Sequence, residues 1–406
     1  MAIFSPADAS RAVEAALDES IAFLKDLVRV PSLLGNEEPV QRVVEERLRE
    51  LGFECRSVQP DPAELARYPD SGIPLIPYDG RRSVVGTLGG QAGRSLLFNG
   101  HVDVVSEEPA DRWTKSPFGA EIEDDRLYGR GACDMKGGVA AMLLAVEAAL
   151  SAGPLESRLV YQSVIEEECG GNGALAACLA GPPADGVVIA EPTNETMDLV
   201  SPGVIWARVT LEGCSRHASH ADEGSNPIEG AFAAITALHE LEARLNGQPD
   251  PEFAEVKSPY LLNVGALHAG DWPSMTPARA ELDVRLGFPI RMEPQEAQAL
   301  LSDAVAGADG NARVEFRGFR ARGYSFDPNS DLVRLLGDCH QEVRGGELVA
   351  EPARATTDLR FFQSSQGVCY GPTGDGLHAV DEWVDLESIA NVATVLALLI
   401  RRWGAG

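Results

Sequence analysis

The chain has 406 residues, which is more than one ordinary domain holds and indicates two domains, each with its own core. Apolar residues make up 44% and charged residues 24%, and no stretch approaches the roughly 20 consecutive apolar residues that a membrane-spanning helix needs. The formal net charge of −28 disfavours anionic partners, because acidic side chains repel nucleic-acid phosphates and anionic lipid head groups. We therefore expect a globular protein that binds neither nucleic acid nor a membrane.

The N-terminal residues have neither the basic start nor the apolar core of a secretory signal, so we expect a cytoplasmic protein. The seven cysteines are scattered, without the paired short spacing of a zinc ribbon or a redox motif. Their odd number and the expected location predict buried thiols instead of disulfides.

The first 200 residues alternate between helical and strand patterns, which is typical of a mainly parallel sheet with helices on both faces. An apolar stripe at helical spacing predicts a first helix that ends at Pro31. A Pro-rich loop follows the second predicted helix. The predicted helices are 11–30, 40–51 and 136–152, and the predicted strands are 83–88, 95–105, 158–165 and 186–190.

From about Gly203 the pattern changes to that of a compact α+β unit, which fits a separate small domain inserted into the first. We predict a catalytic domain formed by residues 1–202 and 320–406, with residues 203–319 as the inserted domain. The predicted elements of the insertion are strands 206–211, 261–268, 278–286 and 313–316 and helices 226–245 and 294–306. After it come a helix at 332–343, a strand at 368–370 and a helix at 386–403.

The strongest local motif is FNGHVDVV at residues 98–105, a polar pair in an otherwise apolar strand. Residues i and i+2 of a strand face the same side, so His101 and Asp103 should emerge together at the carboxyl end of the strand. Catalytic groups of open α/β sheets gather at that end. A carboxylate beside an imidazole also fixes the tautomer of a metal-binding histidine. Taken alone, the motif also fits a structural histidine that its neighbouring aspartate satisfies.

Asp134 lies in the glycine-rich segment YGRGACDMKGG, residues 128–138, directly before a predicted helix. Glycines leave the backbone free to adopt unusual conformations, and a carboxylate shared by two ions needs such freedom to aim both oxygens. The alternative is that Asp134 is only the N-cap of the following helix.

Three consecutive acids, EEE at residues 166–168, follow an apolar predicted strand, and Glu191 follows another. Like charges at a mostly buried site are costly unless cations neutralise them, although the three acids could also form a solvated loop. A second histidine, His378, lies in the glycine-rich loop GDGLHAVDE. Mixed imidazole and carboxylate ligands suit zinc or a similar first-row ion, and the absence of cysteine ligands favours a catalytic metal site over a structural one.

In the order and spacing of these motifs, the sequence resembles the zinc exopeptidase and deacylase family that includes acetylornithine deacetylase, succinyl-diaminopimelate desuccinylase, aminoacylase and bacterial glutamate carboxypeptidase. The resemblance covers nearly the whole chain. It implies an α/β fold, with a mainly parallel mixed sheet and helices on both faces, and an inserted α+β dimerisation or lid domain. It also implies two divalent metal ions per chain, zinc or alternatively cobalt, and a homodimer formed through the lid domain.

The resemblance assigns the metal ligands residue by residue. Asp134 is expected to bridge the two ions, with His101 and Glu191 completing one site and Glu168 and His378 completing the other.

The resemblance also names the residues that act on the substrate. Glu167 is expected to be the general base, which takes a proton from an activated water and returns it to the departing amine. Asp103 is expected to brace His101, and the peptide bond between Asp134 and Met135 is expected to be cis.

Two residues of the inserted domain are further candidates. GCSRHAS at residues 213–219 resembles the lid segment whose histidine reaches the partner subunit's active site, which assigns oxyanion stabilisation to His217 and not to His220. Arg285 is a candidate for gripping a substrate carboxylate, although a single strand arginine also fits a surface ion pair.

The Pro-rich segment 60–79 and GDWPS at 270–274 resemble the acetylornithine-deacetylase-like branch, so the preferred substrate is a small N-acyl amino acid or a related N-acyl amine. The alternatives are a deformylase of an N-formyl aminopyrimidine in thiamin salvage, an N-succinyl desuccinylase, and a dipeptidase or carboxypeptidase. A non-catalytic binding protein of the same fold is disfavoured, because all the expected ligands and Glu167 are present. A phosphate-handling enzyme is disfavoured, because no Gly-x-x-x-x-Gly-Lys-Ser/Thr loop occurs.

Overall fold

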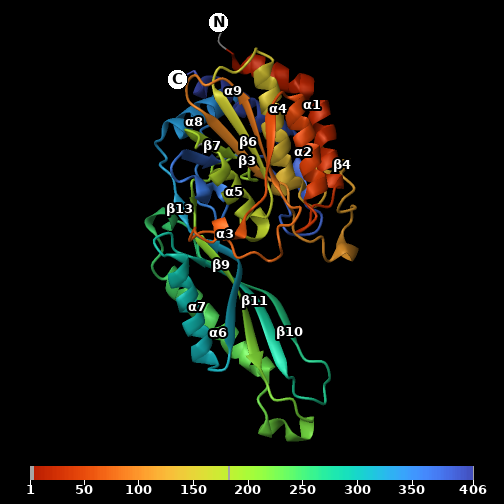
Figure 1. Ribbon diagram of the computed structural model, residues 1–406, viewed down its shortest axis with the longest axis vertical. Helices are drawn as coiled ribbons and strands as arrows, with labels where there is room; N and C mark the ends of the chain where they lie inside the picture. Colours follow the sequence, from red (N-terminus) through yellow and green to blue (C-terminus); the bar gives the residue numbers. More distant parts are fainter. Residues whose placement is uncertain (1–3, 182, 406) are drawn as a thin grey trace.

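The computed structural model describes residues 4–181 and 183–405, which form a larger and a smaller part placed end to end (Figure 1). The larger part is built on a six-stranded sheet in the order β1-β2-β6-β3-β7-β14. Strands β6, β3, β7 and β14 run parallel, whereas β2 pairs antiparallel with both β1 and β6, so the expected mainly parallel mixed sheet is confirmed. The strands are β1 Glu54–Val58, β2 Ser83–Gly89, β3 Leu96–His101, β6 Arg158–Val164, β7 Gly186–Ile189 and β14 Gln366–Cys369.

Helices cover this sheet, and α1, α4 and α9 pack against one another. Helix α4 lies between the other two and is apolar on almost every side, as a fully buried helix must be. This helix begins at Gly137, with Lys136 as its N-cap, so its burial anchors the preceding segment that carries Asp134. The helices are α1 Pro6–Arg29, α2 Glu38–Glu50, α3 Pro62–Leu65, α4 Gly137–Leu150, α5 Asn172–Ala180, α8 Asp331–Arg344 and α9 Leu386–Trp403.

The smaller part is a four-stranded antiparallel sheet in the order β10-β11-β9-β12, packed against two helices. It has a hydrophobic core of its own, separate from the core of the larger part. We call residues 203–321 the lid unit; the domain boundaries 1–202, 203–319 and 320–406 and the dimerisation role stay proposals. Its elements are β9 Gly203–Glu212, α6 Pro227–Asn246, β10 Leu262–Ala269, β11 Arg279–Phe288, α7 Pro294–Ala308 and β12 Arg313–Ala321.

The Pro-rich segment 60–79, which was expected to be a loop, forms hydrogen bonds with both parts of the molecule. Ile73 forms two backbone hydrogen bonds with Gly318 of β12, of 2.8 and 2.9 Å. Gly72 hydrogen bonds through its backbone N–H and C=O to the side chain of Asn172 in the larger part. The segment therefore spans the junction, and Leu75 lines the cleft that lies there.

Short strands complete the larger part. β4 Glu121–Glu123, β5 Arg126–Tyr128, β15 Gly374–Asp375 and β16 Trp383–Asp385 form a small sheet, and β8 Val200–Ser201 pairs with β13 Tyr324–Ser325. All seven cysteines are free as expected, but they are not all buried, because Cys214 is exposed. Within the described residues, no helix combines the length and apolar character needed to cross a membrane.

Candidate metal centre

Polar side chains lie at or just after the C-terminal ends of three neighbouring strands of the central sheet. His101 is the last residue of β3, the three acids 166–168 follow β6, and Glu191 follows shortly after β7. Because β3 pairs in parallel with both β6 and β7, these ends lie side by side. The sheet thus gathers side chains that are far apart in the sequence.

Asp134 lies between the two histidines. His101 Nε2 is 3.1 Å from Asp134 Oδ1 and 3.9 Å from Glu191 Oε2. His378 Nε2 is 3.4 Å from Asp134 Oδ2. Each carboxylate oxygen of Asp134 therefore faces a different imidazole, and the peptide bond after Asp134 is cis as expected.

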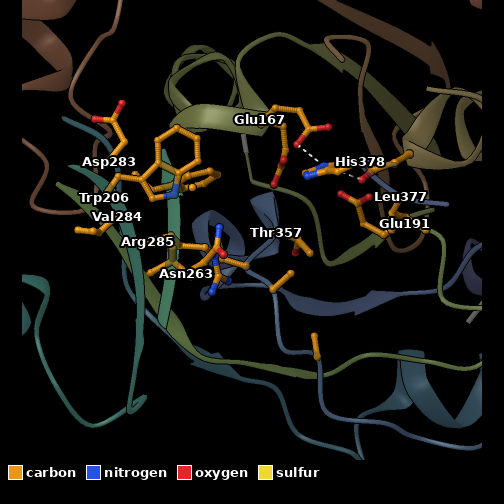
Figure 2. A pocket seen from close by; sticks show the side chains of 18 of the residues that line it. Glu167, Glu191, Trp206, Asn263, Asp283, Val284, Arg285, Thr357, Leu377 and His378 are labelled. Carbon is orange, nitrogen blue, oxygen red and sulfur yellow. Dashed lines mark ion pairs between the residues drawn. The ribbon is translucent and has the colours of Figure 1, made fainter. Parts of the chain in front are cut away.

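Glu168 completes the second group, with its Oε2 atom 3.0 Å from His378 Nε2. Figure 2 shows Glu167, Glu191 and His378 around one end of the cleft. His101, Asp134 and Glu168 each offer a ligand atom, and these atoms lie within 4.8 Å of one another. The structure thus brings together all five residues expected to be metal ligands.

The charges of this pocket fit divalent cations. Burial raises the pKa of Glu191 to about 8, and its Oε1 atom has no hydrogen-bond partner among the described residues. Hydrogen bonds to Asp134 and Glu168 raise the pKa of His378 to about 11. Burying several negatively charged carboxylates together costs free energy unless positive charge compensates them. Two cations around Asp134 would supply that charge. The donor set of imidazoles and carboxylates suits zinc and neighbouring first-row ions.

Glu167 lies in the same cleft and is buried. Burial, followed by the charge of nearby Asp358, raises the pKa of Glu167 well above its usual range. Its Oε1 atom has no hydrogen-bond partner in the described part of the chain. A free carboxylate with a raised pKa suits a group that takes up a proton in one step and releases it in the next.

Asp103 differs from its expected role. His101 Nδ1 donates to the backbone carbonyl of Asp103 at 2.9 Å, whereas the Asp103 carboxylate is 3.8 Å from Nδ1. The carboxylate instead accepts the backbone N–H groups of Glu167 and Glu168, each at 3.2 Å, because it lies beneath the start of the turn that they form. The imidazole is therefore oriented by the backbone through Nδ1, with Nε2 directed toward Asp134, and the Asp103 side chain holds the turn that carries Glu167.

The cleft has a volume of about 510 Å³ and lies between the larger part and the lid unit. Arg285 of β11 lines it, and Asn263 of β10 and Trp206 of β9 are its direct cross-strand neighbours (Figure 2). Opposite residues of paired strands point to the same face, so these three side chains form one row on the lid wall. The sequence patterns did not reveal Asn263 or Trp206, because their alignment depends on strand register.

Arg285 forms no surface ion pair. Its guanidinium donates to the backbone carbonyls of Leu261 and Arg354, and no carboxylate of the described residues pairs with it. Burial lowers the pKa of Arg285. The alternative of a surface ion pair is thus wrong, and the cleft contains an uncompensated cation.

His217 is not part of the cleft of its own chain. It is exposed on the lid unit, where its Nδ1 atom is 2.8 Å from Ser219 Oγ and accepts the backbone N–H of Ser219. The structure brings it near none of the predicted metal ligands, so a role in catalysis requires a second subunit.

The sequence matches the model of peptidase family M20/M25/M40 over residues 97–402, a region that contains the five predicted metal ligands and Glu167. The chain belongs to this family. It is accordingly a metal-dependent hydrolase of amide bonds, and the resemblance to zinc exopeptidases and deacylases is confirmed.

Relatives of this M20-family hydrolase include the succinyl-diaminopimelate desuccinylase of Maricaulis maris (strain MCS10), which is 29% identical over 392 residues, 92% of this chain and 93% of the relative. One similar solved structure is the dipeptidase Dug1p of Saccharomyces cerevisiae, with a TM-score of 0.82, 14% identity and 99% coverage of both chains. Another is an M20 metallo-carboxypeptidase of Sulfolobus solfataricus, with a TM-score of 0.76, 19% identity and coverage of 96% of this chain and 100% of the other. These structures establish the fold. The preference for the acetylornithine-deacetylase-like branch stays a proposal.

Proposed function

We propose that this M20-family hydrolase uses two divalent cations, zinc or alternatively cobalt, to remove the acyl group from a small N-acyl amino acid. The observation that carries the proposal is the position of Asp134 between two imidazole and carboxylate pairs. The same cleft contains the free carboxylate of Glu167 and the uncompensated guanidinium of Arg285. A screen of acetyl, formyl, succinyl and dipeptide substrates on the zinc- and cobalt-loaded protein, with released amine as the readout, tests it.

Cations bound at such a site lower the pKa of a water molecule and polarise the scissile carbonyl. Glu167 accepts the proton of the attacking water as the new C–O bond forms. It then donates that proton to the nitrogen as the C–N bond breaks, so the amine leaves neutral and Glu167 is restored. Asp103 keeps Glu167 in place through the backbone of the turn.

Arg285 is proposed to bind the carboxylate of the amino-acid half of the substrate. Hydrogen bonds to a charged group are worth about 1.5–3 kcal/mol, or roughly 10- to 150-fold in affinity. Arg285→Met should therefore raise KM by about 10- to 100-fold, with a much smaller change in kcat. The matched control is the same substrate with its carboxylate converted to an amide, whose KM should be insensitive to the substitution. Equal KM values for the acid in both proteins would contradict this assignment.

A second candidate is an N-succinyl desuccinylase, whose substrate carries an additional carboxylate on the acyl group. Arg317 also lines the cleft and pairs with no carboxylate of the described residues, which favours this candidate. The name of the Maricaulis maris relative supports it too. A higher kcat/KM for N-succinyl than for N-acetyl derivatives of one amine would select it, and the reverse order would select the simple deacylase.

We also propose that the lid unit forms a homodimer. Strand β10 is an edge strand of its sheet, and the neighbouring helix α6 exposes Phe232 at 63%. Apolar side chains are also exposed on the lid unit at Leu267, Trp272 and Met275. Exposed apolar side chains on a unit with an unpaired strand edge favour a protein interface there.

Phe232→Glu is expected to convert a dimer into a monomer of 43.2 kDa, as measured by light scattering. Because His217 then loses access to a partner's cleft, kcat should fall with the change in mass. His217→Ala should lower kcat by about 10²–10³-fold in an unchanged dimer, the usual loss for one oxyanion donor. Val349→Glu, at an apolar side chain that is 54% exposed outside the lid unit, is the control and should leave the mass unchanged. A monomeric wild type with full activity would exclude the dimer.

A further inference from the structure

Glu382 is a buried carboxylate that none of the proposed chemical steps uses. It follows His378 on the loop between β15 and β16, and only 1% of the residue is exposed. Its oxygens do not face the cations proposed above. They face the glycine-rich segment that precedes Asp134.

That segment wraps around the carboxylate of Glu382. Oε1 accepts the backbone N–H groups of Cys133 at 2.9 Å and Asp134 at 3.1 Å. Oε2 accepts the N–H of Gly131 at 3.0 Å and Nη1–H of Arg130 at 2.6 Å. The backbone carbonyl of Glu382 accepts the N–H of Gly129 at 2.9 Å. A single residue thus sets the path of the chain up to the amide of Asp134.

The same residue ends the loop that carries His378. The His378 side chain is 54% exposed and its backbone has a φ of 58°, so burial does little to hold it in place. Gly374 packs against Cys133, and Gly376 packs against the backbone of Glu382, with no room for a side chain at either position. The two ligand loops are therefore pressed together, with Glu382 at their contact.

We propose that Glu382 is a positioning residue that joins the loop of Asp134 to the loop of His378 and thereby sets the affinity for both cations. Asp134 and His378 come from segments on either side of the lid unit in the sequence, so no local structure aligns them. Charge-assisted hydrogen bonds from three amides and one guanidinium give the needed rigidity. The inference rests on the proposed two-cation site.

Glu382→Gln tests this, because glutamine keeps the shape but turns an NH₂ group toward backbone N–H donors. Supporting groups around metal ligands typically contribute about 10- to 100-fold in affinity, so the zinc Kd should rise by about that factor. The measurement is a chelator competition titration on the metal-free full-length chain, independent of any substrate. An unchanged zinc Kd would overturn the proposal.

The substitution also leaves the buried Arg130 guanidinium without a negatively charged partner, which lowers stability by itself. The double variant Arg130→Gln/Glu382→Gln removes that unpaired charge and provides a folded protein if the single variant unfolds. We expect its Tm to recover relative to the single variant while its zinc Kd remains raised. If the zinc Kd returned to the wild-type value together with Tm, Glu382 would have only a structural role.

Asp250→Asn is the matched control. Asp250 is a buried carboxylate of the lid unit that accepts the N–H of Ile290, the hydroxyl of Tyr260 and a hydrogen bond from Arg291. This variant should lower Tm without changing the zinc Kd. A raised zinc Kd in Asp250→Asn would show that general loss of stability explains the effect of Glu382→Gln. A wild-type chain that binds no zinc would refute the proposed function itself, an outcome distinct from equal binding by wild type and variant.

Discussion

Glu167→Gln is expected to lower kcat by about 10²–10⁴-fold while both cations remain bound. Glu167 lies in the cleft and is buried, but it is not part of the ligand cluster formed by His101, Asp134 and Glu168. Glutamine keeps the shape and removes the proton-accepting oxygen. The measurement is kcat on an N-acyl amino acid together with the metal content of the same sample.

The control for Glu167→Gln is its neighbour in the same turn. Glu166 is also buried, but its carboxylate turns away from the cleft and accepts a hydrogen bond from Tyr78 at 2.9 Å. Glu166→Gln should lower Tm, because it weakens a buried polar contact, and should leave kcat close to the wild-type value. Near-normal kcat in Glu167→Gln, or loss of its metal, would show that Glu167 is not the base.

Asp134→Asn is expected to abolish binding of both cations, whereas His378→Ala should lose only one of them. The reason is that the two oxygens of Asp134 face different imidazoles, so Asp134 belongs to both proposed cation sites. His378 faces only the Oδ2 atom of Asp134 and therefore belongs to one site. Metal analysis after dialysis should find close to no zinc in Asp134→Asn and close to one zinc per chain in His378→Ala. Asp134→Asn with two tightly bound zinc ions would exclude a shared ligand.

Binding of the cations should also stabilise the fold, because it compensates the buried carboxylates around Asp134. A ligand present at about 100 times its Kd adds about 2.7 kcal/mol to the free energy of unfolding. Chelation should therefore lower the Tm of the wild type and leave that of Asp134→Asn nearly unchanged. An equal Tm loss in both proteins would point to an effect of the chelator elsewhere.

Periodicity located most elements but not their limits. Helix α1 begins at Pro6 and not at residue 11, because Ser5 and Asp8 form a capping box before the apolar stripe starts. Helix α5, Asn172–Ala180, was not predicted, since its short run of small apolar residues has no polar face. Strand β1 was missed because it is an edge strand without alternation between buried and exposed residues.

The sequence by itself determined the chemistry available to this protein. Histidines and acids directly after apolar strand runs, together with the glycines around Asp134, predicted a site of imidazoles and carboxylates, and the family resemblance assigned the five expected metal ligands and Glu167. This is possible because parallel strands end at a common edge, so position in the pattern implies proximity in space.

Only the tertiary structure decided how those groups are held and what they face. The Asp103 carboxylate supports the turn of Glu167, and the loop of Asp134 wraps around the Glu382 carboxylate. Both arrangements depend on hydrogen bonds between segments far apart in the sequence. The absence of an acidic partner for Arg285 among the described residues depends on strand register in the lid unit. A hydrogen bond or ion pair requires a distance and a direction, and a linear pattern specifies neither until the chain has folded.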